Sequence, residues 1–464
     1  MLRGHRSVGR LAVGSAAAGL VLAAGLVALT GPWDGGQRSA ERDQAAAAEL
    51  VRGQLPAERL AGTVPVAPAV LTPLDGTSAA PSPEALTRIV APLLEAEALG
   101  EHTAASVVDL ATGTVLYERD ERAGRAPAST VKVATAVAAL SALGPDHRLT
   151  TRVVLDPEDG RAYLVGGGDT TLTAADLEGL ADRTARALAD RGIDRVRLAY
   201  DVSAYPEETH PIGVNTNIAP ITPLQLNAGR LDNSSQGPAD RADDPAKDAA
   251  ESFARQLAEA GVEVDGGLKR RAAPGGAEEL ADHASAPVAS LVERMLTASD
   301  NDLAEALARM TALASDQPGD AGGVRRALTD RLGELGVPLD GVRLADASGL
   351  DREGRLTAAL LTGVLAAAAD PANPELRPTL TGLPVAGFTG TLANRYDGDG
   401  ASGAGTVRAK TGTLTGVNSL AGTATTAEGR VLGFAFLTAD AADAGAAQEA
   451  LDAAAGALAG CACG

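Results

Sequence analysis

The C-terminal third of the chain has an order of elements that few folds can accommodate. Three β-like runs at 406–413, 417–425 and 431–437 follow one another closely, and an alanine-rich helical stretch occupies 441–458. Ala427-Glu428-Gly429 is typical of a hairpin turn between the last two runs. Strands joined by such short connections pair antiparallel, and a sheet with one apolar face needs a helix to cover it. The region therefore predicts an antiparallel sheet covered by helices.

The start of the folded region supplies matching elements. Ser82-Pro83 is typical of a helix start, and apolar residues at helical spacing follow to Leu94. A hairpin is predicted at 104–117 around Ala111-Thr112-Gly113, and a helix from Ser129 to about Leu143. Further helices are predicted at 288–298, 303–313, 323–335 and 357–368. Together these elements indicate an α+β fold in which helices pack on an antiparallel sheet.

Residues 150–285 have a different character and are predicted to be a mixed α/β insert. A hairpin at 153–165, a strand at 196–200 and helices at 174–191 and 246–260 are expected there, with a polar, mobile loop at 230–247. Gly166-Gly167-Gly168 is interpreted as a turn, because the third glycine of a dinucleotide-binding loop is missing. The main domain is then made of two pieces, 83–149 and 286–464.

The N-terminus predicts export from the cytoplasm. Arg3, Arg6 and Arg10 precede 20 residues without charge, Leu11 to Thr30, so that residues 1–33 are either a cleaved signal peptide or a signal anchor. The positive-inside rule places the rest outside the cytoplasm, anchored to the membrane or secreted to the cell wall. Residues 34–82 are rich in proline and alanine and are interpreted as a tether. Contact with the membrane is expected through the N-terminal segment only.

Composition excludes one class of partner and leaves the cysteines open. A net charge of −20 and the absence of any basic block argue against binding nucleic acid. Cys461 and Cys463 at the C-terminus could pair with each other, pair between molecules or stay free. The five histidines have neither metal nor triad spacing, so no metal and no cofactor is expected.

Lysine is rare in this chain, and two of its four lysines lie in short polar motifs. The lysines are at 132, 247, 269 and 410. Ser129-Thr130-Val131-Lys132 opens a predicted helix, where positions i and i+3 share one face, so that Lys132 can act as a base for a nucleophilic Ser129. An ordinary N-capping serine beside a solvated lysine would give the same pattern.

Two further motifs follow along the chain. Ser299-Asp300-Asn301 lies between two helices, and its residue types also suit a simple helix–helix turn. Lys410-Thr411-Gly412-Thr413 lies on a predicted strand, where the lysine and the hydroxyls of Thr411 and Thr413 suit a carboxylate. Gly412 would leave the backbone open to a ligand. Each motif alone is weak, but the three occur together in the order S-x-x-K, S-x-N, K-T-G.

This set of motifs resembles penicillin-binding proteins and β-lactamases. Over about 83–464 the chain is similar to the class C low-molecular-mass penicillin-binding proteins, the D-alanyl-D-alanine carboxypeptidase/endopeptidases. Other segments carry the same resemblance: Gly166–Asp169, Ala219-Pro220, Leu226-Asn227, Asp300–Glu305, Asp346–Leu350 and Gly390–Leu392. The 170 residues from Ser129 to Ser299 agree, because that family has extra domains in this gap.

The resemblance implies a penicillin-binding domain with helices on a five-stranded antiparallel sheet, and a reaction through an acyl-enzyme. Ser129 would be the nucleophile and Lys132 its base, with Ser299 and Asn301 also catalytic. Lys410, Thr411, Gly412 and Thr413 would bind the substrate carboxylate. Peptidoglycan stem peptides are then the expected substrates and β-lactams the inhibitors. A serine β-lactamase and a non-catalytic penicillin-binding scaffold or sensor are the alternatives.

Overall fold

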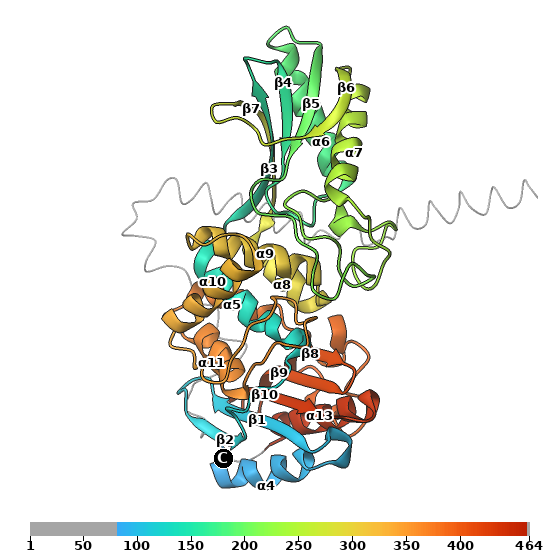
Figure 1. Cartoon of the computed structure of the whole chain (residues 1–464). Helices are drawn as coiled ribbons and strands as arrows, with labels where there is room; N and C mark the ends of the chain where they lie inside the picture. The colour runs from blue at the N-terminus through green and yellow to red at the C-terminus, as the bar shows by residue number, and fades with distance from the viewer. Residues whose placement is uncertain (1–80, 462–464) are drawn as a thin grey trace, which may run out of the picture. The chain divides into compact units, whose positions relative to one another are not determined.

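The computed structural model describes residues 81–461, and its first sheet joins the two ends of this range. The sheet contains β1 (His102–Asp109), β2 (Val115–Arg119), β8 (Val407–Leu414), β9 (Val417–Thr425) and β10 (Val431–Ala439) in the order β2-β1-β10-β9-β8. All neighbouring strands in it are antiparallel. Figure 1 shows the blue N-terminal strands beside the red C-terminal ones. The predicted five-stranded antiparallel sheet, and with it the α+β fold class, is confirmed.

Alternating residues of the central strand β10 explain why helices cover both faces of this sheet. Phe434 and Phe436 belong to the core that includes α4 (Pro83–Leu94) and α13 (Ala444–Ala459). Ala435 and Leu437 belong to the core on the other side. Side chains of a strand point alternately to its two faces, so a strand that is apolar throughout must be buried on both.

The second core is built mainly of helices around α5 (Val131–Leu143), which is buried on almost every side. The helices packed with it are α8 (Val288–Ala298), α9 (Asn301–Ala314), α10 (Ala321–Glu334) and α11 (Ala358–Ala369), and the short α12 (Pro378–Thr381) lies beside them. Small alanine and valine side chains let these helices approach α5 closely. The expected helix start at Ser129 was wrong by two residues, because a 3₁₀ turn covers Ala128–Thr130 and Ala128 has a φ of +48°.

The segment between α5 and α8 forms a second, mixed sheet. It contains β3 (Arg148–Asp156), β4 (Arg161–Val165), β5 (Arg195–Asp201), β6 (Glu263–Arg270) and β7 (Glu278–Pro287) in the order β6-β5-β4-β3-β7. The β4–β5 and β5–β6 pairs are parallel. Helices α6 (Ala174–Ala189) and α7 (Pro245–Glu259) pack on one face. The expected mixed α/β character of the insert is confirmed.

The two ends of this segment meet. Arg148 at the start of β3 pairs with Pro287 at the end of β7, and the Val288 N–H donates to the His147 carbonyl at 2.8 Å. The chain therefore leaves α5 and returns to α8 at nearly the same place. The segment can be inserted there, as a long loop could be, without separating the two pieces of the main domain.

The structure differs from the sequence-based expectations, or goes beyond them, at two strands, one loop and one cysteine. Strands β6 and β7 were not predicted, since their sequences are mostly polar and lack apolar alternation. The polar loop at 230–247 was expected to be mobile, but it is held in two ways. The backbones of Arg230 and Arg241 pair in an isolated antiparallel β-bridge, and the Arg241 side chain forms a buried ion pair with Asp302 at 3.1 Å. Cys461 is disulfide-bonded, and Cys463 lies outside the described residues.

The predicted signal segment and most of the tether also lie outside the described residues. Within residues 81–461, none of the helices combines the length and the apolar character that crossing a membrane requires.

Strand β8 comes unusually close to the turn before α5, and Gly412 permits this approach. A Cβ atom at Gly412 would lie 2.2 Å from the Ser419 Oγ and 2.6 Å from the Pro127 carbonyl oxygen. The Ser419 hydroxyl also donates to that carbonyl at 2.7 Å. The expectation that Gly412 makes room for a ligand is therefore corrected: the space beside its Cα is filled by the protein itself.

Gly412→Ala should lower the free energy of unfolding by about 1–3 kcal/mol, because the new methyl group overlaps backbone that cannot move independently. Gly267→Ala is the matched control, since a Cβ there meets no atom within 4 Å, and it should change stability by less than about 0.5 kcal/mol. Urea unfolding followed by circular dichroism measures both. Equal effects would show that the approach of β8 is not constrained at this point.

Candidate active site

Ser129 lies in the 3₁₀ turn Ala128–Thr130, directly before α5. The turn is held from both sides, because the Pro127 carbonyl accepts hydrogen bonds from the Thr130 hydroxyl at 2.7 Å and from Ser419 of β9. Ala128 adopts a left-handed conformation that alanine rarely occupies. Such strain is sustained only where the surrounding structure imposes it. Ser129 is thus fixed on a rigid support between the helices and the sheet.

Lys132 is fully buried one turn further along, and its amine meets three oxygen atoms. The Nζ atom lies 3.0 Å from the Ser129 Oγ, 2.7 Å from the Asn301 Oδ1 and 2.6 Å from the Ser348 carbonyl oxygen. Burial lowers the pKa of Lys132 to about 8, against the opposing effect of nearby carboxylates, of which Asp346 acts most strongly. The amine therefore loses its proton readily beside the serine hydroxyl.

The Ser299–Asn301 motif both joins two helices and contributes to the site. Ser299 ends α8 in a left-handed conformation, and the Asp300 carboxylate caps α9 by accepting from the Leu303 N–H at 3.0 Å. Asn301 then contacts Lys132 through its oxygen, while its Nδ2 donates to the Asn217 carbonyl at 2.9 Å. The motif therefore forms a helix–helix turn and also places Asn301 in contact with Lys132.

The third motif lies on β8, at the edge of the first sheet. Lys410 is fully buried, and its Nζ donates to the Thr411 carbonyl at 2.8 Å. Burial holds the pKa of Lys410 well below its ordinary value, and the charges of Lys132 and Arg395 add to this effect. Burial is thus the largest cause of the lowered pKa at both lysines, and the charge of Lys132 lowers the pKa of Lys410 further.

Two cavities meet at Ser129, each also lined by Ser299 and Thr413. One, of about 300 Å³, extends toward the insert and is lined by Asn217, Arg230 and Gln236 among others. The other, of about 310 Å³, extends along β8 to α13 and is lined by Thr391, Arg395, Thr411 and Gln448. The Gln448 amide donates to the Thr413 hydroxyl at 3.3 Å, and the Thr391 and Thr411 hydroxyls lie 2.8 Å apart. A chain-like ligand could therefore pass Ser129 from one cavity into the other.

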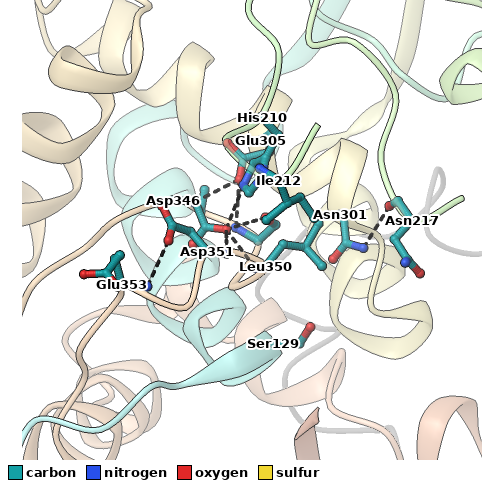
Figure 2. Close-up of polar contacts among 12 residues, drawn as sticks. Ser129, His210, Ile212, Asn217, Asn301, Glu305, Asp346, Leu350, Asp351 and Glu353 are labelled. Carbon is teal, nitrogen blue, oxygen red and sulfur yellow. Dashed lines mark hydrogen bonds and ion pairs between the residues drawn. The ribbon is translucent and has the colours of Figure 1, made fainter. Parts of the chain in front are cut away.

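A buried polar network behind Lys132 was not predicted as part of the site. His210, Glu305 and Asp346 are each less than a tenth exposed and lie around the loop that supplies the Ser348 carbonyl. Figure 2 shows these residues converging on the far side of that loop from Ser129. Glu305 and Asp346 occur in segments that carried the family resemblance, whereas no pattern singled out His210.

These three side chains also bring one ligand-type atom each within 4.8 Å of one another, the spacing of a metal site. Their oxygens are already engaged, however. The Glu305 Oε1 accepts from the Ala347 and Ser348 N–H groups, its Oε2 accepts from Arg309, and Asp346 accepts from His210 and Ser348. We therefore interpret the cluster as a hydrogen-bonded support.

Comparison with known proteins agrees with this arrangement. The chain is 38% identical over 431 residues to carboxypeptidase DacB of Mycolicibacterium smegmatis, with 87% of this chain and 91% of that protein aligned. It is 32% identical to a D-alanyl-D-alanine carboxypeptidase of Actinomadura sp., covering 78% of this chain and 82% of the other. Penicillin-binding protein 4 of Haemophilus influenzae has the same fold, with a TM-score of 0.65 at 22% identity over 81% of this chain and 97% of that one.

The sequence profile of one peptidase family extends over nearly all of the described region, at residues 86–240 and 232–459. The resemblance inferred from the three motifs is thereby confirmed, and the chain belongs to the D-Ala-D-Ala carboxypeptidase 3 (S13) family.

Proposed function

We propose that this protein is a serine D-alanyl-D-alanine carboxypeptidase/endopeptidase that acts on peptidoglycan stem peptides and is acylated by β-lactams. The observation that carries the proposal is the contact of 3.0 Å between the Ser129 hydroxyl and a fully buried amine whose pKa burial lowers to about 8. A neutral amine at that distance can take the hydroxyl proton as the oxygen attacks a carbonyl carbon.

In this mechanism the Ser129 Oγ attacks the carbonyl of the penultimate D-Ala, and Lys132 accepts its proton. The N–H groups of Ser129 and Thr413 stabilise the oxyanion. Collapse of the tetrahedral intermediate breaks the peptide C–N bond, and the proton that Lys132 accepted passes through Ser299 to the leaving amine. Asn301 holds Lys132 in place at 2.7 Å. Water then hydrolyses the ester and releases the shortened peptide. A β-lactam would stop at the ester, since its amine remains attached.

Lys410 and the hydroxyls of Thr411 and Thr413 would bind the terminal carboxylate in the second cavity. The lowered pKa of Lys410 shows how strongly burial disfavours an unpaired cation there. An entering carboxylate would reverse that balance by pairing with the ammonium group. Recognition must be local, because the chain as a whole has a charge of −20.

We further propose that residues 150–285 control access of polymeric substrate, and that the protein works outside the cytoplasm, held or delivered by residues 1–33. The position of Asn217, Arg230 and Gln236 along the first cavity supports a role of the insert in gripping the peptide. The export signal in the sequence supports the location.

Penicillin should acylate Ser129, so that Ser129→Ala gains no adduct mass by mass spectrometry. Ser299→Ala is the control: it should acylate more slowly but still on Ser129, because Ser299 serves proton transfer rather than attack. An adduct on the Ser129→Ala protein would contradict the mechanism. Release of the wild-type adduct within seconds rather than hours would instead indicate a β-lactamase.

The acylation rate should rise with pH through about 8, because only the neutral form of Lys132 can accept the proton. Lys132→Arg should abolish acylation at every pH, since arginine stays charged up to a pKa of about 12 or more. Lys410→Arg should slow acylation but keep it measurable, and Lys410→Ala should be slower still. The second-order rate constant with one penicillin from pH 6 to 10 tests this. A nearly wild-type Lys132→Arg together with an inactive Lys410→Arg would reverse the two roles.

Arg230→Ala should reduce cleavage of a cross-linked peptide by about tenfold while changing penicillin acylation by less than about twofold, because only the longer ligand reaches the insert. Arg195→Ala is the control and should change neither, because the Arg195 side chain is exposed at the start of β5. Liquid chromatography of a purified cross-linked muropeptide measures cleavage. Equal loss of both activities would place Arg230 in the common machinery instead.

A further inference from the structure

The loop that supplies the third oxygen to Lys132 is wound around a single carboxylate. The Asp346 Oδ2 accepts from the Ser348 hydroxyl at 2.8 Å, from the Leu350 N–H at 2.8 Å and from the Asp351 N–H at 3.0 Å. Figure 2 shows Asp346 with Leu350 and Asp351 beside it and marks polar contacts among the residues drawn as dashed lines. The orientation of the Ser348 carbonyl, 2.6 Å from the Lys132 Nζ, therefore depends on how firmly Asp346 is held.

Asp346 is held by a residue of the insert. His210 lies in the long connection between β5 and α7, is 3% exposed, and places its Nε2 3.0 Å from the Asp346 Oδ2. The His210 Nδ1 accepts from the Ile212 N–H at 3.4 Å, so its Nε2 carries the hydrogen that is donated to Asp346. Two residues earlier, Glu208 binds Arg309 at 2.6 Å, and Arg309 binds Glu305 at 2.9 Å.

Resting on the proposed function, we propose that His210 is a positioning residue for the general base: its hydrogen bond to Asp346 fixes the Ser348 carbonyl and the charge that Lys132 experiences. The insert then completes the catalytic centre in addition to controlling access. The effect is indirect, since His210 reaches Lys132 through Asp346 and the loop that carries Ser348.

The surrounding charges set the direction of this effect. Lys132 faces the carboxylates of Asp346, Asp300, Glu305 and Asp302, and it also acts on Lys410. His210 faces Asp346, Glu305 and Asp351. Burial lowers the pKa of His210, but the hydrogen bond to Asp346 and the neighbouring carboxylates outweigh it and leave the pKa above its ordinary value. By donating its Nε2 hydrogen to Asp346, His210 offsets part of the negative charge of the carboxylate that raises the pKa of Lys132 most strongly.

Removing the donor should leave Asp346 less compensated and raise the pKa of Lys132. His210→Phe should move that pKa, and the pH at which acylation rises, upward by about half a unit or more, and should slow acylation near pH 7 by about three- to tenfold. His210→Gln, whose amide can still reach Asp346, should stay close to wild type. His283→Phe is the matched control, because His283 lies 3.9 Å from Asp176 in the insert and has no part in this loop.

The pKa of Lys132 can be followed directly by NMR with ¹³C-labelled lysine, because the chain has only four lysines and Lys132→Arg identifies the signal. The number of penicillin-reactive molecules is counted alongside the rate. A purely structural role would lower that number and leave the rate and the pKa of the remaining active molecules unchanged. If His210→Phe does not fold, His210→Asn, which is polar but too short to reach Asp346, gives the same comparison.

An unchanged pKa of Lys132 and an unchanged rate in a folded His210→Phe or His210→Asn protein would overturn the proposal. So would a His210→Gln protein as impaired as His210→Phe. Failure of the proposed function would look different: wild-type protein would gain no adduct on Ser129, while the NMR titration would still report whether His210 sets the pKa of Lys132.

Discussion

Burial of the Lys132 amine is the constraint on which the rest of the active site depends. An ammonium group removed from water is unstable unless it is paired, and it releases its proton more easily. The Lys132 amine is paired with oxygen atoms from three separate parts of the chain: Ser129 before α5, Asn301 at the start of α9, and Ser348 in the loop before α11. Because one amine must hydrogen-bond to all three oxygens, the positions of α5, α9 and that loop relative to one another are constrained.

The same requirement explains why acidic residues surround an amine that, as the proposed base, must be neutral to act. Without carboxylates, burial would lower the pKa of Lys132 further and leave a weaker base. Asp346, Asp300, Glu305 and Asp302 raise it again to about 8. The negative charge of Asp302 is partly neutralised, since burial raises the pKa of its carboxyl to about 6 and Arg241 pairs with it at 3.1 Å. The base strength of Lys132 is therefore a balance between a dry environment and a set of paired acids.

Sequence reasoning reached the parts of this arrangement that local patterns express. Strand-like runs joined by short turns predicted the antiparallel sheet and the helices packed on it, and the three motifs predicted which side chains lie near Ser129. It could not reach features that arise only when distant segments meet. Strands β6 and β7 carry little apolar alternation, the left-handed Ala128 has no glycine to mark it, and the need for Gly412 comes from Pro127 and Ser419 rather than from a ligand. His210 had no visible signal because its partner, Asp346, lies 136 residues away.

The insert illustrates how a segment can be separate in topology yet joined to the chemistry. Its ends meet where β3 pairs with β7, so its presence imposes little on the paths of α5 and α8. Among the polar contacts that its connection between β5 and α7 nevertheless makes with the surrounding domain are three near Lys132: Asn217 accepts from Asn301, Arg241 pairs with Asp302, and His210 binds Asp346. Each of these contacts ends on a residue that touches Lys132 or acts on its pKa. A movement of the insert would therefore reach Lys132, the proposed general base, as a change in hydrogen bonding and charge, even if Ser129 and β8 stayed in place.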